Sequence, residues 1–163
     1  MPLFINHELI ACNPWQSLEE DQPLPESGHI LLSLQQLIEN KDALSTAPLT
    51  WGLKVNGSED IQQVITESQP LKLIVIEIPA FTDGRGFSFA RMLRRAGFQG
   101  EIRATGDVSR DRLTFLKRCG FNAFDIPEDR YSPELHQAFT EISVHYQGAA
   151  DNAKPVYRQV IEG

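Results

Sequence analysis

Two short segments of similar composition, residues 94–98 and 117–121, constrain the fold more than any other feature of this sequence. Each has two basic residues, one small residue, a glycine and a phenylalanine, and each stands between a helical pattern and a strand-like pattern. After a helix, glycine readily takes the left-handed conformation and the next apolar residue packs back on the helix. A basic pair complements the negative end of the helix dipole. The repeat predicts two equivalent βα units, and aligning them pairs residues of their polar loops: Thr82 with Thr105, Asp83 with Gly106, and Gly84 with Asp107.

Alternation of strand and helix patterns extends this unit over most of the chain. Apolar runs predict strands at 51–55, 71–78, 101–105 and 122–126. Helical spacing of apolar residues predicts helices around 61–65 and at 86–96, 110–119 and 135–146. Strands that alternate with helices over short loops form parallel sheets through right-handed crossovers. The expected fold class is α/β, with four consecutive βα units that form a small parallel sheet or a half-barrel.

The first 32 residues follow a different pattern. Two short apolar stretches flank Asn6-His7, which predicts a β-hairpin arm at the N-terminus, and Pro23, Pro25 and Gly28 mark a loop. Ser33 is a candidate N-cap for a following helix. We expect three parts: a hairpin and loop arm at 1–32, an α/β domain at 33–148 and a flexible C-terminal tail at 149–163.

Composition and spacing exclude several classes of function. The net charge of −7 argues against wholesale binding to nucleic acid or to an anionic membrane. No apolar run approaches the roughly 20 residues that span a bilayer, and the N-terminus lacks the pattern of a signal peptide, so a cytoplasmic protein is expected. The two cysteines and four histidines show no metal-binding spacing, and no cofactor is identified. Phe89 stands where a dinucleotide-binding loop beginning at Gly84 requires glycine.

Each of the four predicted strands carries one charged residue near its C-terminal end, where parallel α/β folds bind ligands. These residues are Lys54, Glu77, Arg103 and Asp125. Glu77 interrupts an apolar run that looks buried on both faces, so its carboxylate needs a partner or an opening. Strand alternation can place Glu77 and Arg103 on one face. They are then either a cross-strand ion pair or an acid–base pair that faces a ligand.

The two polar loops add further candidates at the same strand ends. Asp83, Arg85 and Ser88 lie in the first loop and the helix that follows it, where free amides at a helix N-terminus and a guanidinium group can hold an anion. Asp107 and Arg110 occupy the second loop. Helix capping and tight turns explain some of the same residues. We therefore predict Glu77, Asp83 and Asp107 as catalytic candidates, and the substrate-binding candidates are Lys54, Arg85, Ser88, Arg103 and Arg110.

The segments 81–88, 100–111 and 118–124 resemble a family of uncharacterised proteobacterial proteins labelled as oxidoreductases involved in sulfite reduction. The resemblance covers most of the chain, and genes of this family commonly lie beside those for sirohaem sulfite reductase and phosphoadenylyl-sulfate reductase. It implies an accessory protein of assimilatory sulfite reduction. Such a protein would bind sulfite reductase, or a small anion such as sulfite or a sirohaem carboxylate, at the C-terminal ends of the strands.

Two alternatives remain open from the sequence, and whether the chain is an enzyme is left undecided. The first is a small βα-type lyase or isomerase with Glu77 as general base and Arg103 polarising the substrate. The second is a structural subunit without catalysis, in which a homodimer completes the half-barrel.

Overall fold

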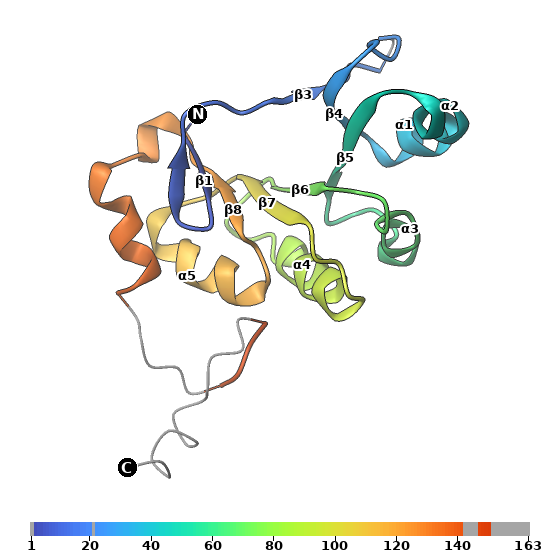
Figure 1. The fold of residues 1–163 in the computed structure, drawn as a ribbon. Coiled ribbons are helices and arrows are strands. Elements are labelled where there is room, and N and C mark those ends of the chain that lie inside the picture. Colours follow the sequence, from blue (N-terminus) through green and yellow to red (C-terminus); the bar gives the residue numbers. More distant parts are fainter. Residues whose placement is uncertain (1, 21, 142–146, 151–163) are drawn as a thin grey trace.

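The protein is built on one curled sheet of eight strands (Figure 1). The structure, a computed structural model, describes residues 2–20, 22–141 and 147–150. The strands are β1 (Leu3–Ile5), β2 (Glu8–Ile10), β3 (Trp15–Ser17), β4 (Gly28–Leu32), β5 (Leu49–Asn56), β6 (Leu73–Ile78), β7 (Glu101–Gly106) and β8 (Ala123–Asp125). Their order across the sheet is β2-β1-β8-β7-β6-β5-β4-β3. Pairing is parallel from β3 to β8, whereas β1 runs antiparallel to both β2 and β8.

Helices connect the parallel strands and pack on one side of the sheet (Figure 1). They are α1 (Leu34–Glu39), α2 (Lys41–Thr46), α3 (Ile61–Glu67), α4 (Arg85–Arg95) and α5 (Arg110–Cys119), followed by the 3-10 segments η1 (Glu128–Arg130) and η2 (Pro133–Phe139). An α-helix was expected at 135–146, but the residues at its start lie in the 3-10 segment η2, so this prediction is wrong there. Its remainder at 142–146, and residues 151–163 of the expected tail, lie outside the described residues.

The length of one linker explains why the sheet curls. Four residues, 11–14, connect β2 to β3, the strands at the two edges of the sheet. This linker spans at most about 18 Å from the end of β2 to the start of β3. Eight strands laid flat at their usual spacing would hold the edges about 34 Å apart. The sheet must therefore curve into the half-barrel that was one of the two expected forms, and the linker crosses its mouth (Figure 1).

The repeated segments end their helices in the same way, which confirms the equivalence of the two helix ends. The glycine of each has a positive φ, 93° in the first and 117° in the second. The amide of Phe98 donates to the carbonyl of Leu93 (3.1 Å), and that of Phe121 donates to the carbonyl of Leu116 (3.2 Å). These bonds close both helices and direct each phenylalanine into the core. The predicted alignment of the loops is wrong, because Thr105 and Gly106 lie in β7 opposite Glu77 and Ile78, whereas Thr82 and Asp83 lie in the loop after β6.

The N-terminal third contributes more to the sheet than its sequence predicts. The hairpin of β1 and β2 is confirmed, with positive φ at Asn6 and His7 in its turn. Ser33 caps α1 in a reciprocal capping box with Gln36. Strands β3 and β4, which the sequence did not predict, extend the parallel sheet beyond β5.

Candidate functional site

The four charged strand residues predicted as a group do share one face of the sheet. The register pairs Lys54 with Val75, Val75 with Arg103 and Arg103 with Ala123, and partners in a parallel sheet point to the same side. Glu77 and Asp125 lie two residues beyond Val75 and Ala123, so they share this side. It is the inner face of the half-barrel, opposite the helices.

The expected pair between Glu77 and Arg103 is wrong, because the Arg103 guanidinium group is bound by Glu101 and Asn13 instead. Glu77 lies opposite Thr105, whereas Arg103 lies opposite Val75. Glu77 instead forms an ion pair with Lys54 on the other neighbouring strand, with Oε2 and Nζ 3.3 Å apart. The Glu77 side chain is 44% exposed, so its carboxylate reaches solvent at the strand end.

Arg103 lies inside the half-barrel, where it holds neighbouring groups in place. The residue is 2% exposed, and Nε donates to Oε1 of Glu101 (2.8 Å). Nη2 lies 2.7 Å from the same oxygen but is not aligned for a hydrogen bond. Nη1 donates to Oδ1 of Asn13 (3.2 Å), which attaches the linker 11–14 to the inner face. Burial raises the pKa of the nearby Asp125 carboxyl group, and Arg103 opposes that shift.

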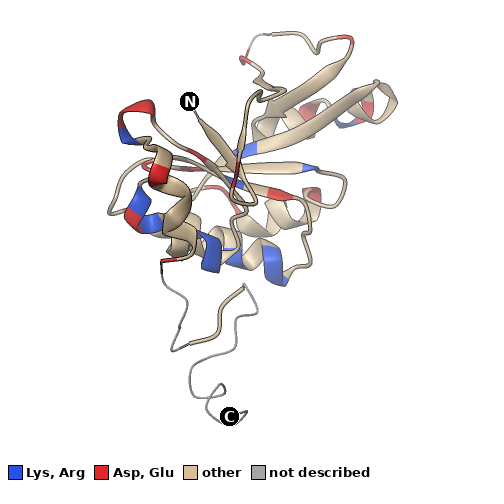
Figure 2. Cartoon of the chain, turned by 60° about the vertical axis from the view of Figure 1, so that its left-hand side comes forward, with Lys and Arg blue, Asp and Glu red and all other residues tan. Residues whose placement is uncertain are grey.

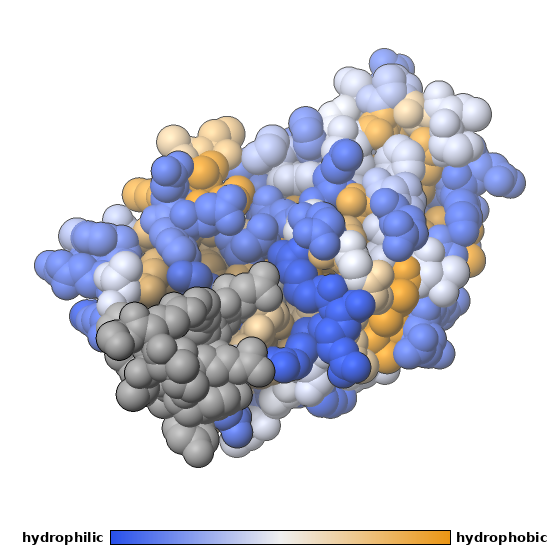
Figure 3. Space-filling view, turned by 60° about the horizontal axis from the view of Figure 1, so that its bottom comes forward, coloured by the Kyte–Doolittle hydropathy of each residue, from blue (hydrophilic) through white to orange (hydrophobic). Residues whose placement is uncertain are grey.

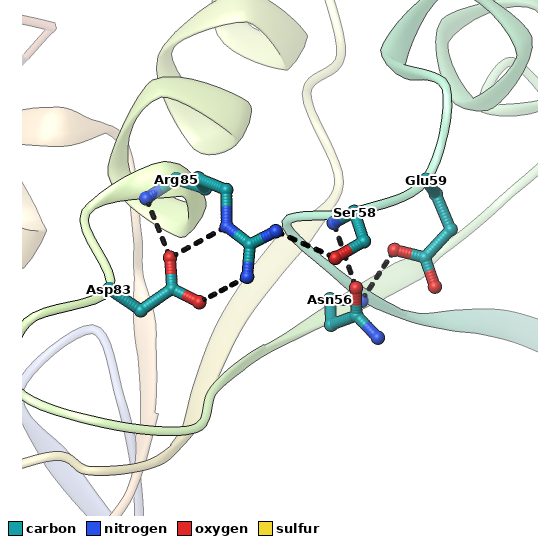
Figure 4. Close-up of polar contacts among 5 residues, drawn as sticks. All are labelled: Asn56, Ser58, Glu59, Asp83 and Arg85. Atoms are coloured by element: carbon teal, nitrogen blue, oxygen red, sulfur yellow. Dashed lines mark hydrogen bonds and ion pairs between the residues drawn. The ribbon is translucent and has the colours of Figure 1, made fainter.

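Asp83 and Arg85 form a closed arrangement at the start of α4 (Figure 4). Oδ1 of Asp83 accepts from the amide and Nε of Arg85 (3.1 and 3.0 Å), and Oδ2 accepts from Nη2 (2.7 Å). Nη1 of Arg85 donates to Oγ of Ser58 in the loop after β5 (2.8 Å). The hydrogen bonds from Arg85 lower the pKa of Asp83 to about 2. Arg85 thus ties two adjacent strand loops together, while Ser88 lies exposed in the first turn of α4.

A glycine makes this contact between the loops possible. A Cβ atom on Gly57 would lie 2.4 Å from Cβ of Arg85, so any larger residue would push the loops apart. Ser58 is held in turn by the Asn56 side chain, whose Oδ1 accepts from the Ser58 amide (2.8 Å), and Glu59 accepts from the Asn56 amide (2.8 Å). Figure 4 shows this chain of contacts reaching from one loop to the other.

Asp107 in the second loop is held between two arginines. Oδ2 accepts from Nη1 of Arg112 (2.8 Å), and Oδ1 accepts from Nη1 of Arg130. Arg112 also donates to the main-chain carbonyl of Asp107 (2.9 Å). The third arginine of this region, Arg110, forms an ion pair with Glu141 instead.

Aromatic side chains outside the predicted set of site residues lie where the first polar loop, α4 and α5 meet. The guanidinium group of Arg112 is sandwiched between the rings of Phe81 and Phe87, 5.2 and 5.1 Å from their centroids. Phe115 lies 5.2 Å from Phe87. Phe81 is 72% exposed and Phe115 57% exposed, although both are large apolar residues. These side chains line an open groove of about 550 Å³, the aromatic groove, formed by Phe81, Gly84, Phe87, Asp111, Arg112 and Phe115.

The sequence carried a partial signal for this groove. Phe115 lies between Leu113 and Leu116 in α5, but it is exposed and lies away from the side of the helix on which those two leucines are buried. A phenylalanine on the polar side of an amphipathic helix is a feature that periodicity can detect. The exposure of Phe81 depends on the path of its loop, which periodicity does not describe.

The residues that the structure describes contain no helix long and apolar enough to cross a membrane. Within the same residues, no group of three or more histidine, cysteine, aspartate or glutamate side chains is placed to hold a metal ion. The cysteines are both free thiols, Cys12 exposed and Cys119 partly buried. Burial raises the pKa of the Cys119 thiol, which does not favour a nucleophilic thiolate.

Comparison with known proteins places this site within a family. No curated protein matches the chain. A family model covers residues 52–157, which includes β6, both polar loops and the helices α4 and α5 that follow them. The chain therefore belongs to the family described as bacterial protein of unknown function (DUF934).

Proposed function

We propose that this chain is an accessory protein of assimilatory sulfite reduction, which docks on sulfite reductase through the aromatic groove. The observation that carries the docking is the pair of exposed rings, Phe81 and Phe115, across one groove at the strand ends. Contiguous exposed apolar side chains mark interaction sites, and buried aromatic anchors contribute most of the energy at protein interfaces.

The ion pairs of the predicted anion-binding arginines favour a protein-docking function over the binding of a small anion. Three arginines were expected to hold the anion, and each already has an acidic partner: Arg85 with Asp83, Arg103 with Glu101, and Arg110 with Glu141. An incoming anion would have to displace a carboxylate from each of them. The aromatic rings need no such exchange, because only solvent covers their exposed surfaces.

The choice of sulfite reductase rests on the family resemblance in the sequence. The segments 81–88 and 100–111 that carry the resemblance contribute Phe81, Gly84, Phe87 and Asp111 to the lining of the groove. A docking role also suits a site whose predicted acid–base residues Asp83 and Asp107 are held by arginines.

Binding to purified sirohaem sulfite reductase, measured by biolayer interferometry, tests this function. The double variant F81S/F115S should bind at least about ten-fold more weakly than the wild type, because it removes both exposed anchors. The matched control L9S/I38S removes two apolar side chains of comparable exposure elsewhere, and its affinity should stay unchanged. Absence of wild-type binding, or equal loss in both double variants, refutes the proposal.

A small lyase or isomerase is the second candidate, because Glu77 is not sealed in the core. Its carboxylate reaches solvent beside Lys54 at the end of β6. Growth on sulfate as sole sulfur source, in a strain that lacks the chromosomal copy, separates the two functions. If E77Q fails to support growth while F81S/F115S succeeds, the enzyme is supported and docking is rejected. The reverse pattern supports docking.

A further inference from the structure

Charge is strongly segregated in this acidic protein. Helix α4 carries four arginines and no carboxylate, which gives +4, and α5 carries four basic residues and Asp111, which gives +3. The whole chain has a net charge of −7, so the rest of it carries −14. Figure 2 shows basic residues gathered on these neighbouring helices on the outer side of the sheet.

The two ends of these helices differ in how their charges are neutralised. At the N-terminal ends, Arg85, Arg110 and Arg112 have acidic partners. Near the C-terminal end of α4, Arg91 and Arg95 are exposed, and neither forms an ion pair among the described residues. Among the described residues, the positive charges of Arg91 and Arg95 are thus left without an acidic partner at this end of α4.

Arg91 and Arg95 lie one turn apart on the same side of α4 and line one polar groove. This basic groove has a volume of about 370 Å³ and is lined by Arg91, Arg94, Arg95, Gln99, Ala149 and Ala150. Figure 3 shows highly hydrophilic side chains gathered on this underside of the molecule.

Among the described residues, those that line the basic groove include no carboxylate. Arg94 donates to main-chain carbonyls and to the Asn122 amide oxygen, all neutral acceptors. Burial lowers the pKa of its guanidinium group. Arg91 and Arg118 both act to lower the pKa of the Cys119 thiol against the effect of burial.

The helix dipole explains part of this pattern, because basic residues are favoured in the last turn of a helix. Arg94 and Arg95 lie in that turn of α4, whereas Arg91 lies before it. Solvated helix surfaces usually intersperse both signs of charge. An eleven-residue helix with four arginines and no carboxylate departs from that pattern.

We propose that the basic groove of α4 binds an acidic segment of a protein, whose carboxylates contact Arg91 and Arg95. Electrostatic complementarity of this kind steers association and selects the partner. A protein segment fits better than nucleic acid, because a polyanion that extends past the groove meets the −14 charge of the remaining chain. The inference does not depend on the aromatic groove, which lies at the other ends of the same helices.

Fluorescence anisotropy of the full chain with fluorescein-labelled hexaglutamate tests this site. The wild type should show saturable binding that weakens between about 20 and about 200 mM salt. The variant R91E/R95E should bind at least about ten-fold more weakly, and R91K/R95K, which keeps the charge, should stay within about three-fold of the wild type. The control K41E/R110E makes the same change in net charge at other exposed ion pairs and should leave the affinity within about three-fold.

Three outcomes overturn the proposal. The first is no saturable binding of hexaglutamate to the wild type. The second is equal weakening in R91E/R95E and K41E/R110E, which reports net charge alone. The third is tighter binding of a labelled single-stranded oligonucleotide of the same length, which assigns the groove to nucleic acid.

Discussion

Replacing Arg94 by alanine should destabilise the fold far more than the same change at its neighbour Arg95. The Arg94 guanidinium joins the ends of both repeated units: Nε donates to Gly120 O, and Nη1 donates to Phe98 O and Gly100 O, each at 2.8 Å. Nη2 donates to Oδ1 of Asn122 (3.1 Å). One side chain therefore fixes the end of α4, the approach to β7, the end of α5 and the start of β8.

The size of the effect follows from these contacts. A hydrogen bond to a charged group contributes about 1.5–3 kcal/mol, but bonds from one side chain are not additive. Arg94 is only part-buried, so water can reach some of the freed carbonyl groups. We expect R94A to lose about 3 kcal/mol, which lowers the melting temperature by about 6–12 °C for a chain of this size. R95A should lose under about 0.5 kcal/mol, as exposed substitutions usually do.

Urea denaturation followed by circular dichroism measures the difference. R94K should fall between the two alanine variants, because an ammonium group keeps the charge but cannot reach all four acceptors at once. If R94A and R95A differ by less than about 0.5 kcal/mol, the contacts of Arg94 do not hold the two units together.

Three further changes test other parts of the fold. G106A should lose about 3 kcal/mol in urea denaturation, because Gly106 has a φ of 89° and an added Cβ would lie 2.4 Å from Ile78 O; a loss below about 1 kcal/mol contradicts this. Burial and a nearby lysine lower the pKa of His7 from 6.5, so the unfolded chain takes up this proton first and stability falls as pH drops below 6.5. H7Q should show a flatter stability profile between about pH 7.5 and 5. D83N should be less stable than the wild type at neutral pH, and the difference should vanish as pH falls from 3.8 to about 2, where Asp83 loses its charge-dependent contacts with Arg85.

The sequence predicted the βα units well because their signals are local. Helix α5 begins at Arg110 and ends at Cys119 as expected, since apolar spacing defines its body and Gly120 its end. Strands β3 and β4 were missed for the opposite reason. A three-residue segment such as Trp15–Ser17 becomes a strand only through its pairing with β4, and that pairing is a tertiary contact.

The candidate site was predicted as a set of residues but not as a set of contacts. Strand alternation correctly placed Glu77 and Arg103 on one face, which Lys54 and Asp125 share. Lys54 and Arg103 both lie opposite Val75, so the register does not decide which of them pairs with Glu77. The contacts of Arg103 with Glu101 and Asn13 decide it. The burial of Arg103 depends on the linker 11–14, some 90 residues away in the chain. The contact of Arg112 in α5 with Phe81 and Phe87 joins two successive βα units, so no spacing within either unit reveals it.

The aromatic and basic grooves can belong to one interface, because they lie on the same helix layer. Helix α4 has eleven residues, so its ends are about 16 Å apart. An ordinary interface covers about 800 Å² on each partner, which corresponds to a patch about 30 Å wide. A single partner with an acidic surface beside an apolar anchor can therefore cover both grooves.

The two grooves should then affect different rate constants for binding to the same partner. Exposed charges act during the diffusional approach, so R91E/R95E should mainly lower the association rate, and added salt should reduce the difference from the wild type. Desolvated aromatic anchors act after contact, so F81S/F115S should mainly raise the dissociation rate at any salt concentration. Both rates come from the same interferometry traces with sulfite reductase. If R91E/R95E leaves the association rate unchanged while F81S/F115S weakens binding, the basic groove serves a separate partner.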